Sequence, residues 1–311
     1  MATITVMGHC PADTDSTCSP IAYAWFLKEI KALDAEAVVS GKLNKEAEFV
    51  LQKFGVKAPQ NIASVSEGDK LVLIDTNNPE ELVKGWESAE IIEIVDHHKL
   101  YGIKTSNIPT VTVRPYGCVA TVLWELMAEA HDKTPKDIAG LLLSCILSDT
   151  LKFTSPTTTE IDKKSAEELA QIAGVDIESL SSEMFAAKSN LDGMSAHDIL
   201  LTDAKDFNFG DKLFKIGVLE TTNPDASLSK RTELEAEMKN IISGESLAGM
   251  FFFVVNILTS ESTLVTVQPS DLEIAEEAFG ATRQENGLLI LPGIVSRKKQ
   301  IVPSIEKVVA L

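Results

Sequence analysis

Carboxylate and imidazole side chains recur in this chain directly after apolar segments. They are His9, Asp13, Asp15, Asp75, Asp96, His97, His98 and Asp149. Carboxylates brought close together repel one another, so they must take up protons or bind cations. Imidazole and carboxylate ligands without thiolate suit Mn²⁺, Co²⁺ or Mg²⁺, with Zn²⁺ as a further option, and the number of carboxylates predicts two ions with a bridging ligand. Such sites hydrolyse phosphoesters or phosphoanhydrides, which is the predicted chemistry.

The segment Glu90–Val95 is predicted to be the strand that positions Asp96, His97 and His98. Its β-branched residues are typical of a strand covered on both faces, as in parallel sheets. In open α/β sheets ligands bind outside the carboxyl ends of the strands, where these three residues would emerge. Because adjacent residues of an extended chain point in opposite directions, we expect the two histidines to have different roles. Two solvated histidines in a polar loop are the alternative interpretation.

Other predicted strands deliver the remaining ligands to the same edge. Ile4–Met7 runs into the loop with the first histidine and aspartates, and Leu71–Ile74 ends at Asp75. A helix is expected to begin at Ser16 or Ser19, with a proline near its first turn. Alternating strands and helices predict an α/β fold, with a mostly parallel sheet flanked by helices in the N-terminal domain.

Asp149 follows a nearly all-apolar predicted helix, Lys136–Leu147. A carboxylate at the C-terminal end of a buried helix faces the unfavourable end of the helix dipole and needs a compensating positive charge. A metal ion would supply that charge. The alternative is an aspartate turned to solvent.

The chain of 311 residues is long enough for two domains. Residues 189–194 are polar, contain glycine, and are predicted to form a linker between domains at 1–188 and 195–311. Beyond the linker, hairpin patterns replace the strand–helix alternation. We therefore expect a smaller C-terminal domain with a mixed sheet and helices.

Composition narrows the partners and the compartment. The net charge of −18 argues against wide contact with nucleic acid. The N-terminus lacks a basic region and no apolar run reaches membrane-spanning length, so we expect a cytoplasmic protein without a membrane partner. The four cysteines show no CxxC spacing and are expected to be reduced thiols.

One dense basic cluster, Ser296–Gln300, lies near the C-terminus of this acidic chain. Arg297 and Lys298, together with Lys205, could hold phosphate oxygens on the side away from the metals. A substrate anion would then lie between the two domains. Solvated basic side chains are the alternative.

These motifs together resemble the family II inorganic pyrophosphatases, which belong to the DHH phosphoesterase superfamily. The Asp-His-His triplet marks the superfamily, whereas Ser-Arg-Lys-Lys-Gln in a second domain is more specific to the pyrophosphatases. The resemblance covers essentially the whole chain. It implies hydrolysis of pyrophosphate to two orthophosphates by a metal-bound hydroxide, with two Mn²⁺ or Co²⁺ ions per subunit and a further Mg²⁺ or Mn²⁺ arriving with the substrate. It also implies a homodimer joined through the N-terminal domain.

The resemblance implies a role for each matching residue. His9, Asp13 and Asp75 would bind one metal, and Asp15, Asp75, His97 and Asp149 would bind the other. Asp96 would orient a histidine by a hydrogen bond. His98 would contact the phosphate near the scissile bridge, and Lys205, Arg297 and Lys298 would hold the substrate. The alternative is a DHH phosphodiesterase acting on short oligonucleotides or cyclic dinucleotides.

Overall fold

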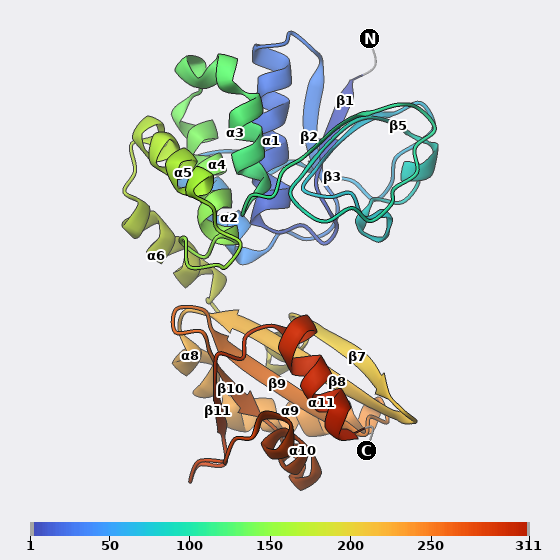
Figure 1. Cartoon of the computed structure of the whole chain (residues 1–311), viewed down its shortest axis with the longest axis vertical. Helices are drawn as coiled ribbons and strands as arrows, with labels where there is room; N and C mark the ends of the chain where they lie inside the picture. Colours follow the sequence, from blue (N-terminus) through green and yellow to red (C-terminus); the bar gives the residue numbers. More distant parts are fainter. Residues whose placement is uncertain (1–2, 310–311) are drawn as a thin grey trace. The chain divides into compact units, whose positions relative to one another are not determined.

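The computed structural model describes residues 3–309, and of Lys298 it describes the backbone alone. Residue contacts divide the chain into two compact units, Met1–Lys188 and Ser189–Leu311 (Figure 1). Among residues 3–309, none of the helices combines the length and the apolar content needed to cross a membrane.

Unit 1 contains a six-stranded sheet in which all pairs of neighbouring strands are parallel. The strands are β1 (Ile4–Met7), β2 (Ala35–Val39), β3 (Gln60–Asn61), β4 (Lys70–Ile74), β5 (Glu90–Asp96) and β6 (Thr110–Val113). Their order is β3-β2-β1-β4-β5-β6, so the chain moves outward from β1 in one direction and then from β4 in the other. The predicted parallel sheet is confirmed, and β1 and β4 flank the topological switch point where α/β sheets bind ligands.

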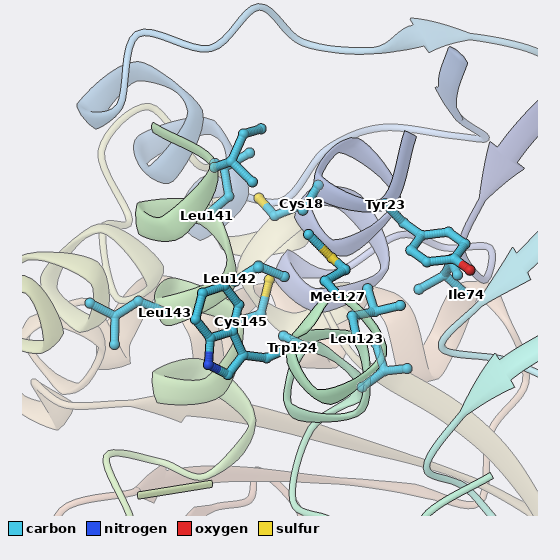
Figure 2. Close-up of a cluster of buried hydrophobic side chains, with 14 of the residues drawn as sticks. Cys18, Tyr23, Ile74, Leu123, Trp124, Met127, Leu141, Leu142, Leu143 and Cys145 are labelled. Carbon is cyan, nitrogen blue, oxygen red and sulfur yellow. The ribbon is translucent and has the colours of Figure 1, made fainter. Parts of the chain in front are cut away.

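Helices cover one face of this sheet. They are α1 (Thr14–Glu29), α2 (Lys45–Lys53), α3 (Val119–Leu126), α4 (Lys136–Asp149), α5 (Glu160–Ala173) and α6 (Ile177–Lys188), with the 3₁₀ helix η3 (Ala128–Lys133) after α3. Two further 3₁₀ helices, η1 (Pro79–Glu81) and η2 (Trp86–Ser88), lie in the connection between β4 and β5. Figure 2 shows Tyr23 from α1, Trp124 from α3, Leu142 from α4 and Ile74 from β4 in one apolar cluster.

The opposite face of the sheet is covered by connecting segments. Leu71 and Leu73 alternate with the helix-facing residues of β4 and pack with Val65, Val83 and Trp86. Successive side chains of a strand point to opposite faces, so the short strand β4 contributes residues to the apolar clusters on both faces of the sheet. The sheet is therefore buried on both sides, as the β-branched sequence of β5 indicates.

The start of α1 differs from the prediction. Asp13 is the N-cap, and its side chain accepts a hydrogen bond from the backbone N–H of Ser16 while the Ser16 hydroxyl accepts one from the Asp13 N–H. The expected caps at Ser16 and Ser19 are wrong, because aspartate is an equally good cap and comes first. Pro20 therefore lies inside the helix rather than in its first turn. Asp13 and Asp15 are thus fixed at a helix start.

Unit 2 contains a five-stranded sheet of order β11-β10-β9-β8-β7, in which β8 and β9 are parallel and the other pairs antiparallel. Its strands are β7 (Ala204–Phe209), β8 (Lys212–Thr221), β9 (Gly249–Asn256), β10 (Glu261–Val265) and β11 (Leu289–Pro292). Its helices are α7 (Ala196–Leu201), α8 (Pro224–Leu228), α9 (Arg231–Gly244), α10 (Pro269–Phe279), the π-helical η4 (Arg297–Ile301) and α11 (Val302–Val309). The predicted mixed sheet with helices is confirmed.

Candidate metal centre

The carboxyl ends of β1, β4 and β5 lie side by side. Met7 pairs with Leu73, and Ile74 pairs with Val95, so the residues that follow these strands emerge together. Asp75 comes directly after β4, and its backbone N–H donates to the carbonyl oxygen of Val95 at 2.9 Å. Its φ of +67° lies in the left-handed region, which aspartate tolerates better than most residues.

His9, Asp13 and Asp75 form a first group of potential metal ligands, with ligand atoms within 4.8 Å of one another. Nε2 of His9 lies 3.4 Å from Oδ2 of Asp13 and 3.5 Å from Oδ2 of Asp75. Nδ1 of His9 lies 2.6 Å from the carbonyl oxygen of Pro11, which can only accept a hydrogen bond. The proton of a neutral His9 ring is therefore on Nδ1, and the Nε2 lone pair faces the carboxylates.

Asp15, His97 and Asp149 form a second group within the same limit. Nε2 of His97 lies 3.8 Å from Oδ2 of Asp149 and 3.2 Å from Oδ1 of Asp75. Nδ1 of His97 donates to the carbonyl oxygen of Tyr116 at 3.0 Å, so the Nε2 lone pair of a neutral ring again faces the carboxylates. A different backbone carbonyl oxygen thus sets the tautomer of each histidine, that of Pro11 for His9 and that of Tyr116 for His97.

Asp75 joins the two groups. Its Oδ2 faces His9 and its Oδ1 faces His97, the geometry of a bridging carboxylate. Oδ1 of Asp75 and Nε2 of His97 are buried and have no hydrogen-bond partner among the described residues. Buried polar atoms nearly always have a hydrogen-bond partner. A cation bound by both atoms would explain why these two have none. The donor set fits two divalent ions of the Mn²⁺ class.

Crowding of the carboxylates shifts their protonation. Burial, then the charges of Asp15 and Asp13, raise the pKa of Asp75 well above its usual range. The same three causes raise the pKa of Asp149. Burial opposes protonation of His9, but Asp13 and Asp75 outweigh it and raise the pKa of His9 to about 10. Metal-free, this cluster holds protons that a cation would displace.

Asp15 is fully buried and its orientation is fixed by donors that the sequence did not indicate. Ser19 donates to its Oδ1 at 2.5 Å, and the Cys118 thiol and the backbone N–H of Val119 donate to its Oδ2 at 2.9 and 3.0 Å. Burial, then the charge of Asp15, raises the pKa of Cys118 well above its usual range. Cys118 is therefore a thiol donor here, and all four cysteines are free.

Asp96 organises the loop that carries the two histidines. Its Oδ1 accepts from the backbone N–H groups of His97 and His98 at 2.7 and 3.1 Å, and from Nδ1 of His98 at 2.9 Å. Asn77 donates to Oδ2 of Asp96 and to the carbonyl oxygen of Lys99. Sequence reasoning missed Asn77, although its place two residues after Asp75 could have indicated it.

The two histidine rings lie together rather than on opposite sides. Their centroids are 4.3 Å apart, so the expectation that His97 and His98 point in opposite directions is wrong. The reason is that β5 ends at Asp96 and the backbone turns immediately afterwards. Their environments still differ, because the side chain of His98 is 48% exposed and that of His97 is 12% exposed. The hydrogen bond that His98 donates to Asp96 raises the pKa of His98.

Unit 2 holds the basic residues predicted to bind substrate. Lys205 is exposed on β7, and the side chain of Lys298 lies outside the described part of the chain. Arg297 begins η4. Its Nη1 donates to the carbonyl oxygen of Asp203 at 2.6 Å, and its Nη2 donates to Oδ1 of Asp203 at 2.7 Å. The side chain of Gln300 accepts from the backbone N–H of Ser296, which folds the basic cluster into a compact turn.

Comparisons with known proteins agree with this two-part architecture. Residues 3–146 match the N-terminal domain of the DHH family, and residues 182–308 match the DHHA2 domain. A protein of Exiguobacterium named as a manganese-dependent inorganic pyrophosphatase is 41% identical over 97% of both chains. A protein of Bacillus licheniformis with the same name is 38% identical over 99% of both chains.

The same relationship holds for a solved structure. The structure described as a family II inorganic pyrophosphatase of Methanococcus jannaschii superposes with a TM-score of 0.73 at 35% identity. The match covers 98% of this chain and 99% of that one. Since the similarity extends over nearly the whole length and includes both domains, the chain belongs to the manganese-dependent, family II inorganic pyrophosphatases of the DHH family.

Proposed function

We propose that the chain hydrolyses inorganic pyrophosphate to two orthophosphates at a centre of two divalent ions. The observation that carries the proposal is Asp75, whose two carboxylate oxygens lie against two different histidines. The names of the relatives from Exiguobacterium and Bacillus licheniformis support pyrophosphate as substrate and manganese as cofactor. We extend the proposal to Co²⁺ as an alternative ion and to a further Mg²⁺ or Mn²⁺ that arrives with the substrate.

The ligand groups support one assignment of the two ions. His9 and Asp13 would hold one ion, His97, Asp15 and Asp149 would hold the other, and Asp75 would bridge them. When bound, such a pair of ions polarises phosphoryl oxygens and lowers the pKa of bound water.

The remaining residues would bind and orient the substrate. Asp96 accepts from Nδ1 of His98 and favours the imidazolium form, in which Nε2 also carries a proton and would donate a hydrogen bond to the leaving phosphate. Arg297, Lys298 and Lys205 would bind phosphate oxygens, and the planar guanidinium of Arg297 suits bidentate contact with two of them. Asp203 would keep that guanidinium in place before substrate binds.

We further propose that the protein is cytoplasmic and acts as a homodimer joined through unit 1. Strand β6 lies at one edge of the six-stranded sheet, and its residue Val111 is 53% exposed. An exposed apolar edge strand is suited to pairing with another chain, here a second copy. Light scattering of the purified protein, compared with a Val111→Lys variant, tests this proposal. A monomeric wild-type protein would contradict it.

Phosphate release tests the enzymatic proposal. The chain, stripped of metal and reloaded with Mn²⁺, is given pyrophosphate, a short oligonucleotide or a cyclic dinucleotide at equal concentration. We expect rapid release of orthophosphate from pyrophosphate alone, abolished by chelator and by Asp75→Ala. Preferential cleavage of a nucleotide substrate would favour the DHH phosphodiesterase alternative, and inactivity with every divalent ion would refute both.

A further inference from the structure

Glu46 is a buried carboxylate outside the ligand groups of the metal centre. It lies in the first turn of α2 and its exposed fraction is 1%. Its Oε2 accepts hydrogen bonds from the hydroxyl of Thr14 at 2.8 Å and from the hydroxyl of Ser148 at 2.6 Å. Nζ of Lys188 lies 4.0 Å from the same oxygen.

The two hydroxyl donors adjoin predicted metal ligands. Thr14 lies between Asp13 and Asp15, and Ser148 directly precedes Asp149. One oxygen atom therefore joins the start of α1 to the C-terminal end of α4, two elements that present ligands to the same centre. The separation between these elements determines whether Asp149 can share an ion with Asp15.

A local role in α2 does not account for Glu46. Asn44 already caps this helix, accepting from the backbone N–H of Ala47 at 2.7 Å. An acidic residue in the first turn gains the dipole interaction while still exposed to solvent, whereas burying a carboxylate is costly. Oε1 of Glu46 is also buried without a hydrogen-bond partner among the described residues. The two hydrogen bonds that Oε2 accepts, from Thr14 in α1 and from Ser148 in α4, explain the burial better.

We propose that Glu46 is a positioning residue of the metal centre, which fixes the distance between the Asp13–Asp15 segment and Asp149. The inference rests on the metal centre of the proposed function. It assigns Glu46 no contact with substrate. Residues that orient metal ligands affect metal affinity by about 10- to 100-fold, and a tether of this kind acts in the same way.

We call the hydrogen bonds from Thr14 and Ser148 to Glu46 the tether. Measuring the affinity for Mn²⁺ directly tests its role without using pyrophosphate. Mn²⁺ is titrated into the metal-free full chain by calorimetry or electron paramagnetic resonance, for Glu46→Ala, Glu46→Gln and Ser148→Ala. We expect Glu46→Ala and Ser148→Ala to weaken Mn²⁺ binding about 10-fold. Glu46→Gln should bind close to the wild-type affinity, because the amide oxygen can accept both hydroxyl donors.

Ser144→Ala is the matched control. Ser144 is also buried in α4, but its hydroxyl donates to the carbonyl oxygen of Gly140 in the same helix. Both serine variants should lose similar thermal stability in chelator, and only Ser148→Ala should lose Mn²⁺ affinity. In the Glu46→Ala background, Ser148→Ala should have no further effect on affinity because the acceptor is already absent.

Unchanged Mn²⁺ affinity in Ser148→Ala, or equal loss in Ser144→Ala, would overturn the inference. If Glu46→Ala fails to fold, the two serine variants still decide the question. A wild-type protein that binds Mn²⁺ without hydrolysing pyrophosphate would refute the proposed function and leave the tether testable.

Discussion

Nε2 of His97 and Oδ1 of Asp75 lie 3.2 Å apart in a buried position, and neither atom has a hydrogen-bond partner among the described residues. Leaving a buried polar atom unsatisfied costs about 1–3 kcal/mol. A cation held by both atoms would remove that cost, so we expect an ion to bind at this pair.

The two adjacent histidines should separate in function when each is replaced by glutamine. His97→Gln removes an Nε2 lone pair aimed at the bridging carboxylate, so Mn²⁺ affinity should fall by at least about 10-fold. His98→Gln removes a group held by Asp96 on the exposed side, so affinity should persist while kcat falls about 10²-fold. Calorimetry and steady-state kinetics measure the two effects. Equal loss of Mn²⁺ in both variants would contradict this division.

Asp75→Asn should have opposite effects on stability with and without metal. In chelator near neutral pH the variant should be more stable than wild type, because asparagine is neutral without taking up the proton that the raised pKa of Asp75 requires beside Asp15 and Asp13. Asparagine also accepts the left-handed backbone at this position. With Mn²⁺ at 100-fold excess over its Kd, wild type should gain about 3 kcal/mol for each bound ion and the variant much less. Denaturant unfolding in EDTA and in Mn²⁺ provides the comparison, and a less stable variant in EDTA would be evidence against charge repulsion.

Asp203→Ala should weaken substrate binding without affecting the metals. The substitution removes the carboxylate that accepts from Arg297 and leaves only the backbone carbonyl oxygen of residue 203, so a more mobile guanidinium must be ordered when substrate binds. We expect KM for pyrophosphate to rise about 10-fold, and Arg297→Lys to do the same because ammonium cannot make a bidentate contact. Mn²⁺ affinity should remain at the wild-type value. Asp211→Ala, at an exposed turn of the same unit, is the control, and an equal rise there would exclude a specific role for Asp203.

Asp271 should make the stability of unit 2 depend on pH. It is buried, it accepts from the backbone N–H of Met250 at 3.1 Å, and burial raises its pKa from 3.8 to about 6. Because the folded state binds the proton more tightly than the unfolded state, this contribution to stability is complete below about pH 4 and is lost as pH rises through about 6. The change is about 3 kcal/mol.

Asp271→Asn isolates the effect. Urea unfolding of the full chain in chelator is compared for wild type and variant between pH 4 and pH 7. The stability of the variant relative to wild type should increase by about 3 kcal/mol over that range. Asp225→Asn, at an exposed position, should show no such trend. A difference between Asp271→Asn and wild type that is independent of pH would refute the prediction.

The sequence predicted that these carboxylates and imidazoles gather at one edge of the sheet because local patterns encode that placement. Each apolar run that ends in a carboxylate or imidazole is a short-range feature, and the rule that parallel strands end together supplies the rest. The start of α1 was misjudged because Asp13, Ser16 and Ser19 are all competent caps, and local preference does not rank them. Strand β3 is only Gln60–Asn61 and exposed, so it has no hydrophobic pattern from which to predict it.

Contacts over long sequence separations could not be predicted in this way. Glu46 lies in a helix recognisable as amphipathic, and charged residues of such helices normally face solvent. Its burial depends on hydroxyl groups 32 and 102 residues away along the chain. The hydrogen bond from Cys118 to Asp15 spans 103 residues, so no local sequence pattern predicts it either.

The left-handed backbone of Asp75 restricts how the metal preference of this protein could be altered. Its N–H is bonded to the end of β5, so the main chain cannot relax to suit a new side chain. Glutamate would reach farther but disfavours this conformation, and cysteine would be strained as well. Conversion of the centre to a softer ion would have to begin at ligands such as Asp13 or Asp149, while the bridge remains a short oxygen donor.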